Sequence, residues 1–148
     1  MGKTAKDKRD RFYRLAKEEG YRARSAYKLI HIDEEFKIFD HVTKVVDLCS
    51  APGSWSQVIA KKLQVNERKD VKIVAVDLQA QAPLNGVITI QGDITDESTA
   101  EKIILKFDDG KADLVVCDGA PDVTGLHDID EFVHAQLILS VSLCLIDN

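Results

Sequence analysis

Four short apolar runs alternate with helix-like stretches along most of the chain. The runs cover residues 44–49, 72–76, 86–90 and 112–117, and the helix-like stretches cover residues 54–63, 98–107 and 131–146. Continuous apolar strands that alternate with helices across short loops are typical of a parallel sheet covered by helices on both faces. The sequence therefore predicts an α/β fold with an open parallel sheet.

The composition excludes several other classes of protein. With 148 residues, 45% hydrophobic and 30% charged, the chain suits one globular domain rather than a disordered or fibrous protein. The three cysteines lie far apart without a CxxC pair, which argues against a disulfide framework or zinc site and favours a reducing compartment. The sequence shows no secretory leader and no apolar run of about 18 residues. We expect a cytoplasmic protein with no membrane partner.

The first 30 residues differ in charge from the rest of the chain. They carry ten Lys and Arg against four acidic side chains, a net charge of +6, whereas the remaining 118 residues have a net charge of −11. A basic end on an acidic body indicates a polyanionic partner. Aromatic residues lie among the arginines (Phe12, Tyr13, Tyr21 and Tyr27), and this mixture suits single-stranded or loop RNA, with no DNA partner expected. The alternative is a solvated, charge-rich helix.

We predict two helical pieces in this region, broken at Gly20, with the second over residues 22–35. We interpret residues 1–30 as a basic helical RNA-binding arm and residues 31–148 as the α/β domain.

Informative residues follow the ends of the predicted strands. The first run leads through Pro52 and Gly53 into a helix for which Ser54 is a plausible N-cap. A strand, a tight glycine loop and a helix N-terminus together can bind a nucleotide-like ligand, although such a turn often only connects two elements. A dinucleotide fingerprint needs three glycines at set spacing, so the single Gly53 gives little support for a nicotinamide-binding oxidoreductase.

Three carboxylates end the next three strands: Asp77, Asp93 and Asp118. In open α/β sheets the ligand lies beyond the carboxyl ends of the strands, so these residues are expected to face one crevice. Asp77 has the position to bind ribose hydroxyls, or it is a loop acid; Asp93 has the position to bind an adenine amino group, or it forms a turn. Trp55 packs either on the ligand or in the core. Three carboxylates without metal-type spacing favour a cationic ligand, and a sulfonium qualifies.

Two histidines invite a metal interpretation. His127 and His134 lie beside Asp128 and Asp130, but their separation is not that of a helical i,i+4 pair and no thiol lies near them in the sequence. We expect loop and surface roles for them and no metal site.

Five stretches of the chain resemble the FtsJ/RrmJ-like 2′-O-ribose RNA methyltransferases. They are AKDKRD at 5–10, YRARSAYKL at 21–29, VDLCSAPGSWSQ at 46–57, VDLQ at 76–79 and CDGAPDVTGLHD at 117–128. These matches are long and nearly continuous, and with the residues between them the resemblance covers residues 2 to about 140. Within the family, the resemblance is to eukaryotic members that methylate riboses of the tRNA anticodon loop.

The resemblance implies a Rossmann-like, S-adenosylmethionine-dependent methyltransferase fold, with residues 31–148 as the N-terminal part of that domain. It implies cofactor binding by positions that match Gly53, Trp55, Asp77, Asp93 and Asp118. The family's catalytic set is Lys-Asp-Lys-Glu, and its first Lys and its Asp match Lys28 and Asp118. Without the resemblance, we would interpret Lys28 as one more phosphate-binding cation on a basic helix. The resemblance further implies tRNA as the substrate and helper proteins that direct the choice of site.

One departure from the family pattern concerns the second Lys and the Glu of the catalytic set. This sequence stops before either position. We expect from this a fragment, a truncated gene model or a short splice product, with a sheet that is incomplete in its C-terminal half. Two alternatives to the tRNA enzyme stay open: a catalytically inactive fragment that binds cofactor or RNA, and an rRNA 2′-O-methyltransferase of the same family.

Overall fold

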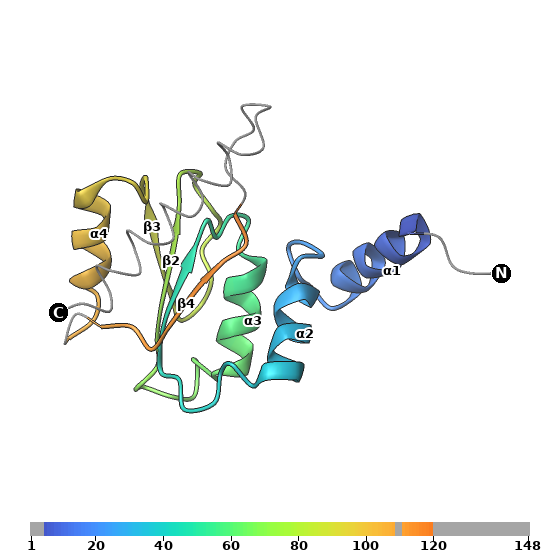
Figure 1. Ribbon diagram of the computed structural model, residues 1–148, viewed down its shortest axis with the longest axis horizontal. Coiled ribbons are helices and arrows are strands. Elements are labelled where there is room, and N and C mark those ends of the chain that lie inside the picture. The colour runs from blue at the N-terminus through green and yellow to red at the C-terminus, as the bar shows by residue number, and fades with distance from the viewer. Residues whose placement is uncertain (1–4, 109–110, 120–148) are drawn as a thin grey trace.

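The structure is a computed structural model, and it describes residues 5–108 and 111–119. Figure 1 shows a central sheet with helices on both sides of it. The helices are α1 (Ala5–Glu18), α2 (Ala26–Phe36), α3 (Ser54–Lys62) and α4 (Glu97–Ile104). The strands are β1 (Lys44–Leu48), β2 (Lys72–Asp77), β3 (Val87–Gln91) and β4 (Leu114–Cys117).

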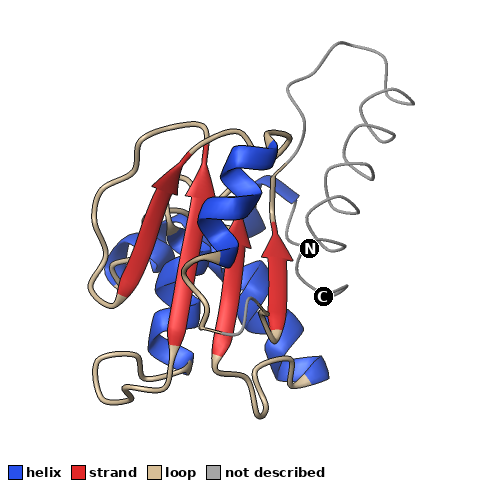
Figure 2. Cartoon of the chain, turned by 90° about the vertical axis from the view of Figure 1, so that its left-hand side faces the viewer, coloured by secondary structure: helices blue, strands red, loops and turns tan. Residues whose placement is uncertain are grey.

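The four strands are parallel and lie in the order β3-β2-β1-β4. The chain therefore builds outward from β1 through β2 to β3, and then crosses back to place β4 on the other side of β1. Strand order reverses between β1 and β4, which makes this the topological switch point of the sheet. All four strands end at the same edge, as Figure 2 shows by its arrowheads. The predicted α/β fold with a parallel sheet is confirmed.

Side chains alternate between the two faces of the sheet, and each face has its own core. Val45 and Ile73 pack with α2 and α3 in one cluster, whereas Val46 and Val74 pack against Ile103 of α4 in the other. Burial on both faces explains why β1 and β2 read as continuous apolar runs rather than as alternating ones. In Figure 1, α1 lies beyond α2, on the side away from the sheet.

The helices α4 and α3 begin with different kinds of cap. Asp96 is the N-cap of α4, and its side chain accepts a hydrogen bond of 3.1 Å from the backbone N–H of Ser98. The prediction that Ser54 caps α3 is wrong, because Gly53 is the N-cap and Ser54 is the first helical residue. The Ser54 hydroxyl instead pairs with the Ser25 hydroxyl at 2.9 Å.

The N-terminal region divides close to where the sequence predicted. Gly20 has a φ of +78° and separates α1 from the following turn. The second helix begins at Ala26 rather than at residue 22. The expected arm boundary at residue 30 falls inside α2, and Ala26 and Leu29 belong to the core.

The predicted helix over 131–146, together with His127 and His134, lies outside the described residues. Among residues 5–108 and 111–119, no helix is both long and apolar enough to cross a membrane.

Candidate active site at the carboxyl edge of the sheet

A tight loop over residues 49–53 joins β1 to α3. Cys49, the first residue after β1, has a φ of +54°, and the Ser50 N–H donates to the Val76 oxygen at 3.0 Å, which ties the loop to β2. Gly53 has a φ of +106°, in the region that side chains disfavour. A Cβ on Gly53 would also lie 2.7 Å from Nη1 of Arg22. Both the backbone conformation and the position of Arg22 favour glycine here.

The side chain of Arg22 crosses the loop and joins it to a second one. Its Nη1 donates to the Pro52 oxygen at 3.0 Å and to the Ala82 oxygen at 2.8 Å, and its Nη2 donates to the Pro83 oxygen at 2.8 Å. Charge-assisted bonds of this kind are stronger than those between neutral groups. The sequence analysis counted Arg22 only as a cation of the arm. Its place in the stretch 21–29 was the one signal that could have singled it out.

Asp77 also holds the loop over residues 49–53. Its Oδ2 accepts a hydrogen bond of 2.9 Å from the Ala51 N–H, and its Oδ1 accepts one of 2.8 Å from the Gln79 N–H. Gln81 follows on the same segment, and its Nε2 donates to the Ser50 hydroxyl at 2.7 Å. Each carboxylate oxygen can accept more than one hydrogen bond, so Asp77 keeps capacity for a ligand while it orders the loop.

Trp55 belongs to the core of the protein. Its side chain is buried, and Nε1 donates to the Ser25 oxygen at 2.9 Å, which joins α3 to the start of α2. This position agrees with the core alternative of the sequence analysis. The bond gives the indole N–H a partner, as buried Trp residues require.

Asp93 lies on the exposed turn after β3. Its Oδ1 accepts hydrogen bonds from the Thr95 N–H at 2.8 Å and from the Thr95 hydroxyl at 2.6 Å. These bonds stabilise the ionised form and hold the pKa of Asp93 below its usual range. The turn remains tied to β2, because the Gly92 N–H donates to the Asp77 oxygen at 3.0 Å.

Lys28 and Asp118 meet at the switch point. Nζ of Lys28, on α2, lies 2.8 Å from Oδ1 of Asp118, the first residue after β4. The Asp118 side chain is 25% exposed and that of Lys28 is 65% exposed, so the ion pair is open to solvent on the lysine side. Gly119 packs on Cys49, and a Cβ there would collide with the Cβ and Sγ of Cys49. The end of β4 is thereby held close to the loop after β1.

Asp47 is a buried carboxylate to which the sequence analysis gave no role. It lies in β1, and its Oδ2 accepts a hydrogen bond of 2.5 Å from the Ser56 hydroxyl, whereas its Oδ1 has no hydrogen-bond partner among the described residues. Burial raises the pKa of Asp47 to about 7, and the Ser56 hydroxyl opposes that rise. A carboxylate inside the apolar run 45–48 was the sequence signal that pointed to it.

The structure brings only some of the predicted residues into contact. Lys28 contacts Asp118 directly, and Asp77 binds the Ala51 N–H of the loop that ends at Gly53. Trp55 lies in the core, where it joins α3 to the start of α2, and the Asp93 side chain binds Thr95 of its own turn. Within residues 5–108 and 111–119, no group of three or more His, Cys, Asp or Glu side chains is arranged to hold a metal ion.

This geometry defines a class of protein. A parallel sheet in the order 3-2-1-4, with a glycine loop and helix N-terminus beside the switch point, is the ligand-binding arrangement of Rossmann-like α/β proteins. Residues 21–147 match the family described as FtsJ-like methyltransferase. The chain belongs to that family, and its fold is a Rossmann-like methyltransferase fold.

Individual relatives agree with the family. The chain is 64% identical over 140 residues to a mouse tRNA (cytidine(32)/guanosine(34)-2'-O)-methyltransferase, covering 95% of this chain and 43% of that protein. It is 48% identical over 134 residues to a Methanothrix thermoacetophila ribosomal RNA large subunit methyltransferase E, covering 90% and 49%. A crystal structure from Plasmodium falciparum, described as a ribosomal RNA methyltransferase, matches with a TM-score of 0.68 and 31% identity, covering 82% and 69%. The chain spans about half the length of these curated relatives.

Proposed function

We propose that this protein transfers a methyl group from S-adenosylmethionine to ribose 2′-hydroxyls in the tRNA anticodon loop. The observation that carries the proposal is the contact between Lys28 and Asp118 at the switch point, beside the Gly53 loop. The substrate is proposed from the mouse and human relatives, which are named as tRNA 2′-O-methyltransferases. We also propose that helper proteins direct the choice of site, as the family resemblance implies. The proposed compartment is the cytoplasm.

The residues at this edge fit S-adenosylmethionine. Backbone N–H groups at the start of α3 suit its carboxylate, and the absence of a Cβ at Gly53 lets a ligand approach the backbone closely. Asp77 would accept from the ribose hydroxyls and Asp93 from the adenine amino group, while Trp55 would hold α3 in place. The buried Oδ1 of Asp47, which has no partner in the described part of the chain, lies in β1 two residues before this loop. Three carboxylates suit a cationic ligand.

When bound, the cofactor supplies an electrophilic methyl group on a sulfonium. A ribose hydroxyl is a poor nucleophile until its proton is removed or strongly polarised. The ammonium of Lys28 can orient the 2′-oxygen, and the Asp118 carboxylate fixes that ammonium at 2.8 Å. The proton that the hydroxyl loses would pass to solvent, because the ion pair is open to solvent on the lysine side. Holding the oxygen in line with the methyl group lowers the entropic part of the barrier. Asp118 would therefore serve both the cofactor side and the reacting oxygen.

A ribosomal RNA substrate is the second candidate, because the Methanothrix relative, which is named as a ribosomal RNA methyltransferase, is 48% identical to this chain. Higher identity, 64%, favours the tRNA assignment.

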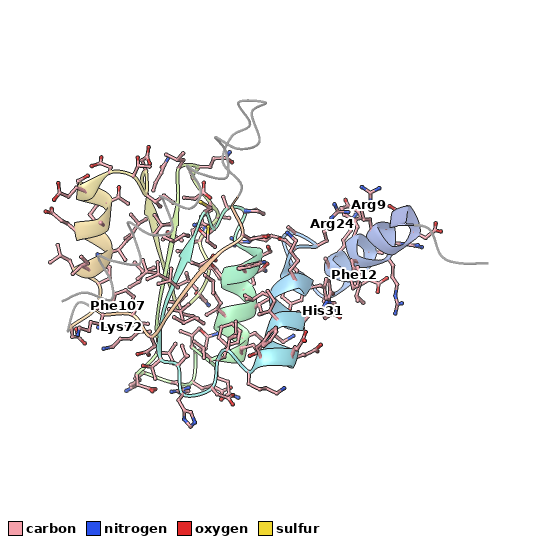
Figure 3. All side chains as sticks on the ribbon, in the orientation of Figure 1. Arg9, Phe12, Arg24, His31, Lys72 and Phe107 are labelled. Atoms are coloured by element: carbon pink, nitrogen blue, oxygen red, sulfur yellow. The ribbon has the colours of Figure 1, made fainter. Side chains whose placement is uncertain are left out.

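The test is methyl incorporation into unmodified tRNA and rRNA transcripts, with the modified ribose mapped by its resistance to alkaline cleavage. Lys28→Met and Asp118→Asn should each lower the rate by about 10²-fold, the scale on which the misplacement of a reacting group is felt. The matched control is Lys72→Met. Lys72 forms a similar ion pair of 2.8 Å with Asp108, but it lies at the amino end of β2 (labelled in Figure 3), so this change should leave the rate unaltered.

Three outcomes contradict parts of the proposal. Methylation of rRNA but not tRNA selects the second candidate. Cofactor binding without transfer to either RNA selects the catalytically inactive alternative. Normal rates in both Lys28→Met and Asp118→Asn refute the catalytic assignment.

A further inference from the structure

A separate cavity lies between α1 and α2, outside the cofactor edge. Its volume is about 540 Å³, within the range of about 300–1,000 Å³ that is usual for small-molecule sites. The lining side chains that matter here are Arg9, Phe12, Arg24, Tyr27, Lys28 and His31. None of the residues that line this cavity is acidic. The cavity is therefore cationic and aromatic at once.

The aromatic part of the cavity is a packed group of rings. The ring centroids of Phe12 and Tyr27 are 5.3 Å apart, and those of Phe12 and His31 are 5.8 Å apart in an edge-on arrangement. Tyr27 is buried, whereas Phe12 is half-buried and His31 is exposed. The buried ring thus supports two rings that stay accessible, and a flat ligand could stack on them.

The cationic part of the cavity lies beside these rings. Arg9 comes from α1, and Arg24 from the turn before α2; both side chains are exposed. In Figure 3 the labelled Arg9, Arg24, Phe12 and His31 follow one another along the junction of α1 and α2. Guanidinium groups bind phosphate in a two-pronged geometry, so the cavity offers a phosphate site next to a stacking site.

Lys28 connects this cavity to the candidate active site. It lines the cavity and also contacts Asp118 at 2.8 Å. An RNA strand that places a ribose at Lys28 and Asp118 would therefore bring an adjoining nucleotide to the cavity. Stacking of unpaired bases on aromatic side chains, with arginines on the backbone, is the usual way in which proteins bind single-stranded RNA.

We propose that the cavity between α1 and α2 holds a nucleotide next to the methylated one, with its base on Phe12 or His31 and its phosphate on Arg9 and Arg24. The inference rests on the proposed function for the identity of the RNA. It goes further in assigning a nucleotide-binding subsite and in separating two arginines from the general charge of the arm.

The first experiment separates a specific site from bulk charge. Affinity for an unmodified anticodon stem-loop is measured at fixed salt for the double variant Arg9→Gln/Arg24→Gln and for the matched double variant Arg11→Gln/Arg14→Gln. Both remove two positive charges, but Arg11 and Arg14 do not line the cavity. The variant Arg9→Gln/Arg24→Gln should lose at least about tenfold more affinity for the RNA than the variant Arg11→Gln/Arg14→Gln. Equal losses would show that only the net charge matters and would overturn the proposal.

The second experiment separates a nucleotide from a bare phosphate or an acidic group. Phe12→Leu keeps an apolar side chain against Tyr27 but removes the flat ring, and Tyr13→Leu removes an exposed ring of α1 outside the cavity. Stacking of one base is worth about 5- to 100-fold in affinity, so Phe12→Leu should weaken RNA binding on that scale and Tyr13→Leu should not. Matching thermal melts show that both variants fold. An unaltered affinity in Phe12→Leu excludes the nucleotide.

The two proposals fail in different ways. If the wild-type protein methylates tRNA but the two arginine pairs bind RNA equally, the cavity assignment fails and the proposed function stands. If no RNA is methylated but the arginine pairs still differ and Phe12→Leu still weakens RNA binding, the cavity assignment stands and the proposed function fails.

Discussion

Arg22 occupies the space that a side chain on Gly53 would need. Nη1 of Arg22 lies 2.7 Å from the position of a Cβ on Gly53, and the same guanidinium binds the Pro52 carbonyl. A residue of the basic N-terminal region is thus part of the framework around the candidate cofactor loop. Because of this contact, we expect Gly53→Ala to lower the free energy of unfolding by more than its backbone strain alone.

The glycines at positions 53 and 20 make a matched pair for testing this contact. Both have a positive φ, +106° and +78°, so Gly53→Ala and Gly20→Ala should each lose about 1–3 kcal/mol to backbone strain. A Cβ at Gly20 meets no atom within 4 Å, whereas one at Gly53 meets Arg22. Urea denaturation should therefore show a larger loss for Gly53→Ala, accompanied by weaker cofactor binding. Equal losses in the two variants would mean that Arg22 moves aside without cost.

Asp77→Ala should weaken S-adenosylmethionine binding by about 1–3 kcal/mol, the scale for losing hydrogen bonds to a charged group. The variant also removes the acceptor for the Ala51 N–H. Titration calorimetry measures the change. The control is Asp70→Ala, which removes an exposed carboxylate paired with Arg68, two residues before the amino end of β2. Unchanged affinity in Asp77→Ala would refute the assignment of the cofactor site.

Asp47 makes stability depend on pH. Its pKa rises from an ordinary 3.8 to about 7 on folding, so the folded state holds this proton more tightly than the unfolded state does. The stabilisation is present at low pH, declines as pH rises between about 4 and 7, and is lost above 7. The slope from one proton is at most about 1.4 kcal/mol per pH unit. Asp47→Asn should flatten this decline in urea denaturation, because the amide does not titrate. The amide oxygen can still accept a hydrogen bond from Ser56, so the variant should fold.

The exposed Asp40→Asn serves as the control for that measurement. An identical slope in wild type and Asp47→Asn would show that Asp47 is ionised in the folded protein throughout this range.

Affinity for tRNA should fall steeply with salt, because phosphate contacts by Lys and Arg release bound counterions. Deletion of residues 2–11 removes five basic and two acidic side chains and should flatten the plot of log affinity against log salt. Cofactor binding should persist, because none of the contacts described around the Gly53 loop comes from these residues. An unchanged salt slope would mean that the segment is only a solvated helix.

The strands, and the strand ends that carry the site residues, could be predicted from the sequence. Burial on both faces of the sheet makes each strand a continuous apolar run, which is easy to recognise. Apolar runs that stop at Asp77 and Asp118 mark where parallel strands end, and the end of a strand fixes the edge of the sheet. The cap of α3 was mispredicted for a local reason: a serine before a helix is a good cap, but the positive φ at Gly53 shifts the helix start by one residue.

Contacts between distant parts of the chain could not be predicted in the same way. Arg22 binds carbonyls 30, 60 and 61 residues away, and no spacing rule connects a guanidinium to main-chain oxygens at such separations. The pairing of Lys28 with Asp118 was implied only by the resemblance. The position of Trp55 stayed open because a large aromatic residue suits a core and a ligand equally well.

The bond from Trp55 to the Ser25 oxygen has a consequence for how a substrate can be received. It joins the start of α2 to α3, and both helices share one core with the sheet, so Lys28 and the Gly53 loop are held on one packed unit. We expect the nucleic acid rather than these helices to change shape, with a nucleotide leaving its stack to reach Lys28 and the Gly53 loop. Target choice would then follow how cheaply each nucleotide unstacks, which favours loops over paired stems.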